Sequence, residues 1–376
     1  MKVNKRPIRI SINHHQLRHT CWFLNVTNVN PSLIGYGVLI LASIGIPANI
    51  IVVAALTRNA ELSKHFFNWL LTMLIVIDTF FLAFGMFEAI RLICDEPATM
   101  TIIYVAIIYP ICSTLMLASI SMTVLLAYER YKAVTTTLYE GNVNNIPHPW
   151  LHLMRFVTPV IGGVILYTLP KFWELELDSL TIHGSNNSTQ NLHQNISNIA
   201  ALEIVFSPLR LNRSYVLWYI TIGTTLMTNI LPLSLLVYFN SKIYFGLKRF
   251  SEIRRHLRTD TEVPSTNQPT RQKEPNTTVL LVMICMYLSC NILRLILNIS
   301  EMISYEDQRK SNKIGCFGTH YWMLIATIIS TFLVYLNPIA NLFAYVIANS
   351  KLREILITTM IRPAYECIAN NFPRLW

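Results

Sequence analysis

The sequence predicts an all-α membrane protein: a seven-transmembrane helix bundle followed by a short amphipathic eighth helix. Two observations carry this prediction. The chain of 376 residues is 53% hydrophobic and only 13% charged, with a mean hydropathy of +0.42, whereas a soluble domain has about 25% charged residues. Long apolar runs also recur seven times along the chain, and a helix needs roughly 20 apolar residues to cross the hydrocarbon core of a bilayer.

The seven runs follow one another in a single membrane domain, residues 33–348, after an N-terminal tail of residues 1–32. A backbone inside lipid must satisfy its own hydrogen bonds, which leaves helices or closed barrels, and runs of this length indicate helices. We expect the spans at about 33–57, 66–91, 100–131, 151–171, 213–247, 275–302 and 319–347.

Charge and glycosylation sequons favour an extracellular N-terminus. This orientation places 17 Lys and Arg residues on the cytoplasmic side and 12 outside, in keeping with the positive charge of cytoplasmic loops. The net charge of +10 is therefore assigned to these loops and not to nucleic-acid binding. In the same orientation, the glycosylation sequons of the N-terminal tail and of the loop after the fourth span face the extracellular side. These sequons begin at Asn25, Asn186, Asn187, Asn195 and Asn212.

Two cytoplasmic segments have distinct compositions. Residues 248–276 begin with a basic stretch, which we expect to extend the fifth helix, and end rich in Pro, Thr and Gln, which is typical of disorder. In residues 349–376, Leu352, Ile355 and Leu356 recur at helical spacing beside Lys351 and Arg353. This pattern predicts an amphipathic helix on the inner membrane face, followed by a short cytoplasmic tail.

Few ionisable residues interrupt the spans. They are Asp78, Glu88, Arg294 and the adjacent Glu129 and Arg130 at the end of the third span. A charge within a span costs roughly 2.5–3.5 kcal/mol on insertion scales. Such residues usually face the bundle interior and mark function, so we treat these five as candidate functional residues.

Short motifs accompany these residues in a consistent order. Asn49 lies in GIPANI of span one, Asp78 in LIVIDTFF of span two, and Pro232 in NILPLSLL of span five. The motif Glu129-Arg130-Tyr131 ends span three, and NPIANLFAY closes span seven. Together the motifs resemble those of the rhodopsin-like (class A) G-protein-coupled receptors.

A narrower resemblance rests on YTLPKFWELEL at the end of span four, LRLNRSY before span five, and the polar face of span six. In addition, Asn341 stands where most of the class has tyrosine. This set is similar to the FMRFamide-receptor-like neuropeptide receptors of invertebrates, of nematode type. The chain departs from the class at Val105 and in the loop 171–212, because neither offers the cysteines of the usual disulfide, and at Asn291 and Leu293, which replace the usual tryptophan and proline of span six.

The resemblance implies a switch at the cytoplasmic side. In the class, the acid beside the arginine holds it until activation frees the arginine for a G protein, a role that falls here to Glu129 and Arg130. The alternative is that the pair merely ends the span at the membrane interface. The implied switch residues are Glu129, Arg130, Tyr131, Asn337, Pro338, Asn341 and Tyr345.

The resemblance also implies two internal sites. Asp78, Ser119 and Asn337 match a sodium pocket, since a lone buried carboxylate needs a partner or a cation; the alternative is a neutral, hydrogen-bonded acid. Ile120, Pro232 and Tyr287 match a packing switch, for which ordinary core packing is the alternative. No cofactor other than this sodium ion is expected.

The polar face of span six and Glu88 of span two predict a ligand site in the outer half of the bundle. A Glu and an Arg at this depth on different helices indicate either a structural ion pair or a peptide site. The acidic start of the loop after span four, Glu174, Glu176 and Asp178, is expected to be solvated, with steering of a cationic ligand as the alternative. The candidate ligand-binding residues are Glu88, Cys112, Trp218, Arg294, Asn298, Glu301, Tyr321 and Trp322.

The favoured function is a plasma-membrane receptor that couples an extracellular, amidated FMRFamide-like peptide to a heterotrimeric G protein, with arrestin and the lipid bilayer as further partners. A chemosensory receptor for an environmental peptide or small molecule is the alternative. A channel or transporter would carry more intramembrane charge or broken helices in paired halves. The exposed segments contain no metal cluster, nucleophile–base pair or phosphate loop, so no enzyme activity is expected.

Overall fold

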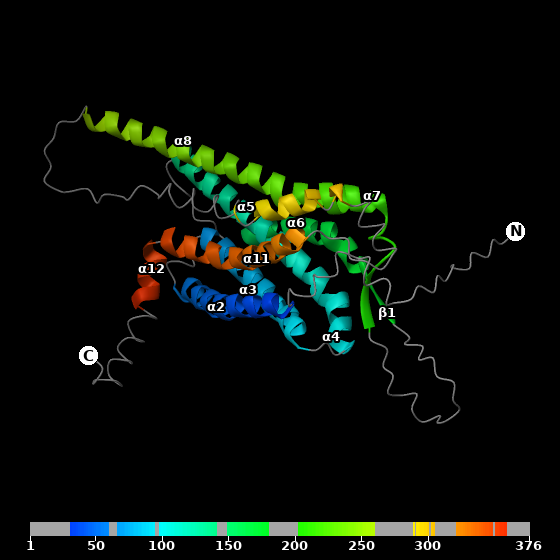
Figure 1. The fold of residues 1–376 in the computed structure, drawn as a ribbon. Helices are drawn as coiled ribbons and strands as arrows, with labels where there is room; N and C mark the ends of the chain where they lie inside the picture. Colours follow the sequence, from blue (N-terminus) through cyan, green and yellow to red (C-terminus); the bar gives the residue numbers. More distant parts are fainter. Residues whose placement is uncertain are drawn as a thin grey trace, which may run out of the picture.

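The structure is a computed structural model that describes residues 31–59, 66–94, 98–140, 149–179, 202–259, 289, 291–300, 302–304, 321–348 and 350–358. Helices dominate these residues, and most of them run side by side in one bundle (Figure 1). A β-hairpin lies at one end of the bundle and the short helix α12 (Ser350–Leu356) at the other. We call these the hairpin end and the α12 end.

Six helices among the described residues are long and apolar enough to cross a membrane: Leu33–Arg58, Phe66–Ile93, Met100–Ala133, Leu153–Trp173, Arg213–Gly246 and Ile325–Ile347. They begin and end close to six of the seven spans expected from the sequence. Most of the remaining span, 275–302, lies outside the described residues, and within it Asn291–Ser300 forms a shorter apolar helix. The chain is therefore consistent with a largely helical, multi-pass membrane protein.

The six membrane-length helices are assembled from the following elements. The first two are α2 (Pro31–Arg58) and α3 (Phe66–Ile93). The third joins α4 (Ala98–Ile103), the π-helical turn η3 (Tyr104–Ile108) and α5 (Tyr109–Glu140). The fourth is α6 (Pro149–Thr168) with the 3₁₀ turn η4 (Leu169–Trp173). The fifth runs through α7 (Arg213–Tyr215), η5 (Val216–Gly223) and η6 (Leu226–Ile230) into α8 (Leu231–Thr259), and the last is α11 (Tyr321–Ala348).

The distribution of polarity is that of a membrane protein. Large apolar side chains lie on the outside, such as Leu166 at 74% and Phe245 at 64% exposed, while Asn49, Asp78 and Ser119 are buried inside. Without water outside the bundle, apolar side chains gain little from burial, and polar ones are best placed between helices. The core holds apolar residues as well, and a cluster around Leu71, Leu74, Met122 and Leu126 joins α3 to α5.

Two predictions about the segments after spans five and seven can be compared with the structure. Helix α8 continues to Thr259, so the basic start of the loop after span five extends the fifth helix as expected. Helix α12 buries Leu352 completely, and Ile355 and Leu356 pack against the same core cluster. The place of α12 on a membrane surface stays a prediction.

The loop after span four contains a hairpin that the sequence did not predict. Strand β1 (Leu175–Ser179) pairs antiparallel with β2 (Leu202–Phe206), and Leu175 stands opposite Phe206. The base of the hairpin is closed where the Ser207 amide donates to the Glu174 carbonyl oxygen at 3.1 Å. The residues that join β1 to β2 lie outside those described.

Candidate functional site

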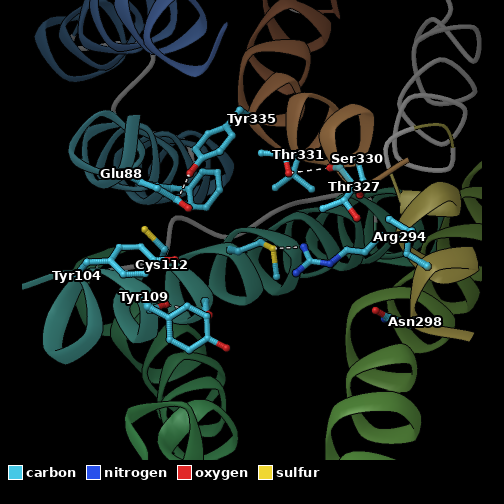
Figure 2. A pocket seen from close by; sticks show the side chains of 15 residues that line it. Glu88, Tyr104, Tyr109, Cys112, Arg294, Asn298, Thr327, Ser330, Thr331 and Tyr335 are labelled. Atoms are coloured by element: carbon cyan, nitrogen blue, oxygen red, sulfur yellow. Dashed lines mark hydrogen bonds between the residues drawn. The ribbon is translucent and has the colours of Figure 1, made fainter. Parts of the chain in front are cut away.

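A cavity of about 360 Å³ lies between α3, η3, α5, α11 and the helix Asn291–Ser300 (Figure 2). It brings together four of the eight residues predicted to bind a ligand. Three tyrosines and four serine or threonine side chains that were not predicted complete much of the polar lining. The polar and sulfur-containing lining residues are Glu88, Tyr104, Tyr109, Cys112, Ser113, Met116, Arg294, Asn298, Thr327, Ser330, Thr331 and Tyr335.

One side of the cavity is acidic. The Tyr335 hydroxyl donates to Glu88 Oε2 at 3.0 Å (Figure 2). Tyr335 is itself fixed, because it is 5% exposed and its ring stacks on that of Phe81 with centroids 5.0 Å apart. One turn beyond Glu88, the Arg91 guanidinium lies 4.1 Å from the ring centroid of Tyr104. The carboxylate of Glu88 thus accepts a hydrogen bond from a buried, stacked phenol and lines the cavity.

Another side of the same cavity is basic. Arg294 reaches across it so that its Nη1 contacts the sulfur of Met116, and Asn298 follows one turn later on the same helix. No Glu88–Arg294 ion pair within 4.0 Å occurs, although both residues are described. Glu88 and Arg294 thus line the same cavity without forming a direct ion pair, and a ligand role for either residue stays a prediction.

The π-helical turn η3 explains why two tyrosines enter this wall. Tyr104 and Tyr109 are five residues apart, and the Tyr109 amide donates to the Tyr104 carbonyl oxygen, which is the i→i+5 bond of a π-helix. Their rings therefore lie near each other, with centroids 6.3 Å apart. An α-helix would have turned the two side chains to different faces.

The other four predicted ligand residues are not placed in this cavity. Trp218 is 66% exposed and Trp322 is 49% exposed, and neither lines the cavity. Tyr321 begins α11, but its side chain is not among those described, and Glu301 lies outside the described residues. Exposed tryptophans near helix ends are typical of the aromatic belt at a membrane–water interface.

Glu174, which the sequence led us to expect in a solvated acidic loop, is completely buried. Its carboxylate accepts hydrogen bonds from Tyr109 of α5 and from Tyr215 of α7 at 2.8 Å. It also pairs with Lys171 of η4, whose Nζ lies 2.9 and 3.1 Å from the two oxygens, and with Arg210, whose Nη1 lies 3.4 Å away. We call these five residues the Glu174 cluster.

The electrostatics of the cluster keep Glu174 ionised. Burial alone would raise the pKa of its carboxyl, but the charges of Lys171 and Arg210 and the hydrogen bonds from Tyr109 and Lys171 outweigh burial, so the pKa lies below its usual range. Lys171 is in turn repelled by Arg210 and by Arg294. The negative charge of Glu174 therefore compensates the positive charges of Lys171 and Arg210 at this end of the bundle.

Two of the three residues of the predicted sodium site, Asp78 and Ser119, are buried and bonded to each other. Ser119 donates its hydroxyl to Asp78 Oδ1. Among the described residues, neither side-chain atom of Asn49 has a hydrogen-bond partner, and Asn337 Oδ1 has none. A second cavity of about 20 Å³ touches Ser119 and Asn337, which is room for about one water-sized occupant. Oxygen ligands suit a hard cation, but Asp78 does not line this cavity, and a sodium ion at these residues stays a prediction.

The predicted packing switch is only partly described. Ile120 is buried and packs against Leu236 and Leu233 of α8, next to the buried Pro232. Ile120 also lines the 20 Å³ cavity together with Pro338. Tyr287 lies outside the described residues.

At the α12 end, Arg130 lies over an aromatic ring. Its guanidinium carbon is 3.5 Å from the ring centroid of Phe67 on α3. Glu129 and Arg130 are both described, and no ion pair within 4.0 Å joins them. Tyr131 stacks on Phe239 of α8, with centroids 5.7 Å apart. The neighbouring acid therefore does not hold the arginine in this structure, and Phe67 does.

The remaining switch residues, Asn337, Pro338, Asn341 and Tyr345, lie on α11, and all of them except the half-buried Asn337 are buried. Asn341 and Tyr345 are each 7% exposed. The Tyr345 hydroxyl has no hydrogen-bond partner among the described residues.

Of the predicted glycosylation sites, Asn212 alone is described. It is exposed and caps α7, where its Oδ1 accepts from the Ser214 amide at 2.9 Å. Asn25, Asn186, Asn187 and Asn195 lie outside the described residues.

No protein-family model matches the chain. The sequence is similar to a protein described as an FMRFamide receptor from Drosophila melanogaster, with 26% identity over 253 residues. The aligned part covers 66% of this chain but only 38% of that receptor. This similarity and the six membrane-length helices are consistent with a receptor of the G-protein-coupled type.

Proposed function

We propose that this chain is a plasma-membrane receptor, with its N-terminus outside, that an extracellular neuropeptide activates and that signals through a heterotrimeric G protein. The observation that carries the proposal is the cavity in which Glu88 and Arg294 face a shared space. Its volume of about 360 Å³ falls within the 300–1,000 Å³ typical of ligand pockets. The similarity to a protein described as an FMRFamide receptor supports a peptide ligand.

The finer proposal is a rhodopsin-like receptor of invertebrate type whose ligand is an amidated FMRFamide-like peptide. Such a peptide carries an arginine and a neutral carboxamide. Glu88 would accept hydrogen bonds from the peptide arginine, and the phenol rings of Tyr104, Tyr109 and Tyr335 would flank its aliphatic and aromatic parts. Arg294 would donate to the carbonyl oxygen of the terminal amide. A charge-assisted bond of this kind is roughly twice as strong as a neutral one.

At the α12 end, the same proposal gives Arg130 the contact with the G protein. Arg130 is exposed, and its contact with Phe67 is of a kind worth only about 0.5–1 kcal/mol at an exposed site. A G protein can therefore displace it at small cost. A sodium ion held by Asp78, Ser119 and Asn337 would supply the positive charge that the buried carboxylate needs. Arrestin is a further proposed partner, and no enzyme activity is proposed.

A peptide screen tests the proposal. Cells expressing the full chain would receive a panel of C-terminally amidated peptides that end in Arg-Phe, with calcium and cAMP as readouts. We expect at least one peptide to give a concentration-dependent response that untransfected cells lack. Responses to small non-peptide chemicals, with none to the peptides, would instead favour the chemosensory alternative.

A variant at Glu88 then tests the assignment of the pocket. Glu88→Gln should weaken an active Arg-containing peptide by about tenfold or more, because a hydrogen bond to a charged group is worth about 1.5–3 kcal/mol. The same variant should barely change the response to an analogue in which citrulline replaces that arginine. Glu252→Gln, at an exposed acid on α8, is the matched control. Equal losses for both peptides would remove Glu88 from the ligand site.

A further inference from the structure

The β1–β2 hairpin is attached to the membrane helices in an unusual way. The chain contains no cysteine between Cys112 and Cys285, so no disulfide can start from this loop. Strand β1 begins directly after Glu174, and the residue after β2, Ser207, is bonded back to Glu174 and Trp173. Glu174 therefore stands at the base of the hairpin, directly before β1 and bonded through its backbone to the residue after β2.

The same side chain reaches three membrane helices. Tyr109 comes from the third, Lys171 from the end of the fourth, and Tyr215 from the start of the fifth. Lys171 and Arg210 are only 14% and 19% exposed in their side chains, and Glu174 is 0% exposed. One carboxylate thus binds groups from distant parts of the chain. Arg210, Tyr215 and Tyr109 lie 36, 41 and 65 residues from Glu174, and Lys171 lies three residues before it.

One member of the Glu174 cluster also belongs to the cavity. The Tyr109 side chain lines the pocket (Figure 2), and its hydroxyl is the group that donates to Glu174. Rings packed around the cluster restrict it further: Tyr215 stacks on Tyr219 at 4.9 Å, and Tyr219 stacks on Tyr167 at 5.2 Å. A change at Glu174 would therefore be transmitted to the pocket wall through one hydrogen bond.

We propose that Glu174 is a positioning residue for ligand binding: its carboxylate anchors the β1–β2 hairpin to three helices without a disulfide and fixes the Tyr109 side chain in the cavity wall. The anchoring follows from the contacts alone. The effect on ligand binding rests on the proposed function, so the two parts require separate measurements.

Hydrogen exchange of the full chain in lipid nanodiscs, with no ligand added, tests the anchoring. Glu174→Gln should accelerate exchange of the strand amides Leu175–Ser179 and Leu202–Phe206 by about tenfold or more, because it removes a charged acceptor from several donors. Glu176→Gln, two residues away and exposed, is the matched control and should change nothing. A reducing agent should also leave exchange unchanged. Unaltered exchange in Glu174→Gln, or release of the hairpin by the reductant, would overturn the proposal.

Agonist potency in cells tests the positioning, using the most active amidated Arg-Phe peptide of the panel. Tyr109→Phe keeps the ring and removes the hydroxyl, and we expect a potency loss of about tenfold. If Glu174 acts through that hydroxyl, the double variant Tyr109→Phe/Glu174→Gln should lose no more potency than Glu174→Gln alone. A potency loss equal to the product of the two single losses would refute the positioning role. Should Glu174→Gln fail to reach the cell surface, Tyr215→Phe, which removes one donor and no charge, replaces it in both experiments.

If no peptide activates the receptor, the proposed function fails while the exchange result still decides the anchoring. If peptides activate it and the Glu174→Gln hairpin stays protected, the anchoring fails while the proposed function stands.

Discussion

Glu174 illustrates how a single residue differs from its neighbours in an acidic stretch. Glu176 is exposed, whereas Glu174 is buried among two cations and two phenols. Removing one partner from a buried ion pair typically costs on the order of 3–5 kcal/mol, because the other charge stays buried without compensation. Protonation of Glu174 should have the same effect as its replacement by Gln.

The pH dependence of stability tests this equivalence. The folded pKa of Glu174 lies below its ordinary value of 4.5, so its contribution is fully present above about pH 4.5 and is lost as the pH falls through the folded pKa. The charged and titratable groups that face it are Lys171, Arg210, Tyr109 and Tyr215. We expect wild type to melt above Glu174→Gln at neutral pH, with the difference in Tm constant down to about pH 5 and shrinking below about pH 4.5. A difference that persists at pH 3 would contradict the assignment.

Sequence patterns alone could not have found this cluster or all of the pocket. Glu88, Cys112, Arg294 and Asn298 were found because a polar residue within an apolar span is conspicuous. Tyr104 and Tyr109 were missed because the 3.6-residue period of an α-helix would place their side chains on different faces. Only the π-helical turn brings the two rings together. Glu174 was misread because its partners Tyr109 and Tyr215 lie 65 and 41 residues away. Long-range contacts of this kind leave no local periodicity.

At the scale of elements, the pocket depends on a close approach of α3 and α11. Gly85 of α3 lies under the ring of Tyr335, and a Cβ built on it would be 2.9 Å from Tyr335 Cζ and closer still to Cε1. The ring has little freedom to yield, since it is buried and stacked on Phe81. The glycine therefore allows Tyr335 to reach Glu88.

Gly85→Ala should move Tyr335 away from Glu88 and lower the potency of an Arg-containing peptide by about tenfold, in line with the 1–3 kcal/mol that overpacking of a core costs. Gly162→Ala on α6 is the control, because a Cβ there meets nothing within 4 Å and alanine favours a helix over glycine. Both variants add one methyl group to a helical glycine, so their surface expression and dose–response curves can be compared directly. Unchanged potency in Gly85→Ala would mean that the Tyr335–Glu88 contact does not shape the pocket.

At the scale of the whole molecule, the membrane-length helices were predictable because lipid leaves an apolar run few alternatives to a helix. The ends of six of them agree with the spans expected from the sequence to within a few residues at most positions. The β1–β2 hairpin was not predictable, because the formation of strands in a polar loop depends on tertiary contacts with residues distant in the sequence. The sequence also implied that Glu129 holds Arg130, whereas sequential neighbours on a helix point in different directions and the arginine lies over Phe67 instead.

Helix α5 joins the two ends of the molecule. Cys112 and Met116 line the large cavity, Ser119 binds Asp78, and Arg130 lies 18 residues beyond Cys112, about 27 Å along the helix at 1.5 Å per residue. A change at the pocket can therefore reach the α12 end through one continuous element.

If α5 carries the signal, the two ends should be separable by mutation. Arg130→Ala should abolish G-protein activation while agonist binding and surface expression stay within about twofold of wild type, since Arg130 is exposed and lies far from the cavity. Arg58→Ala is the matched control, because it removes the same charge from an exposed residue at the same end of the bundle. Radioligand binding and a nucleotide-exchange assay on the same membranes measure the two properties. Normal exchange in Arg130→Ala, or equal losses in both variants, would show that general positive charge at this end, and not the arginine over Phe67, contacts the G protein.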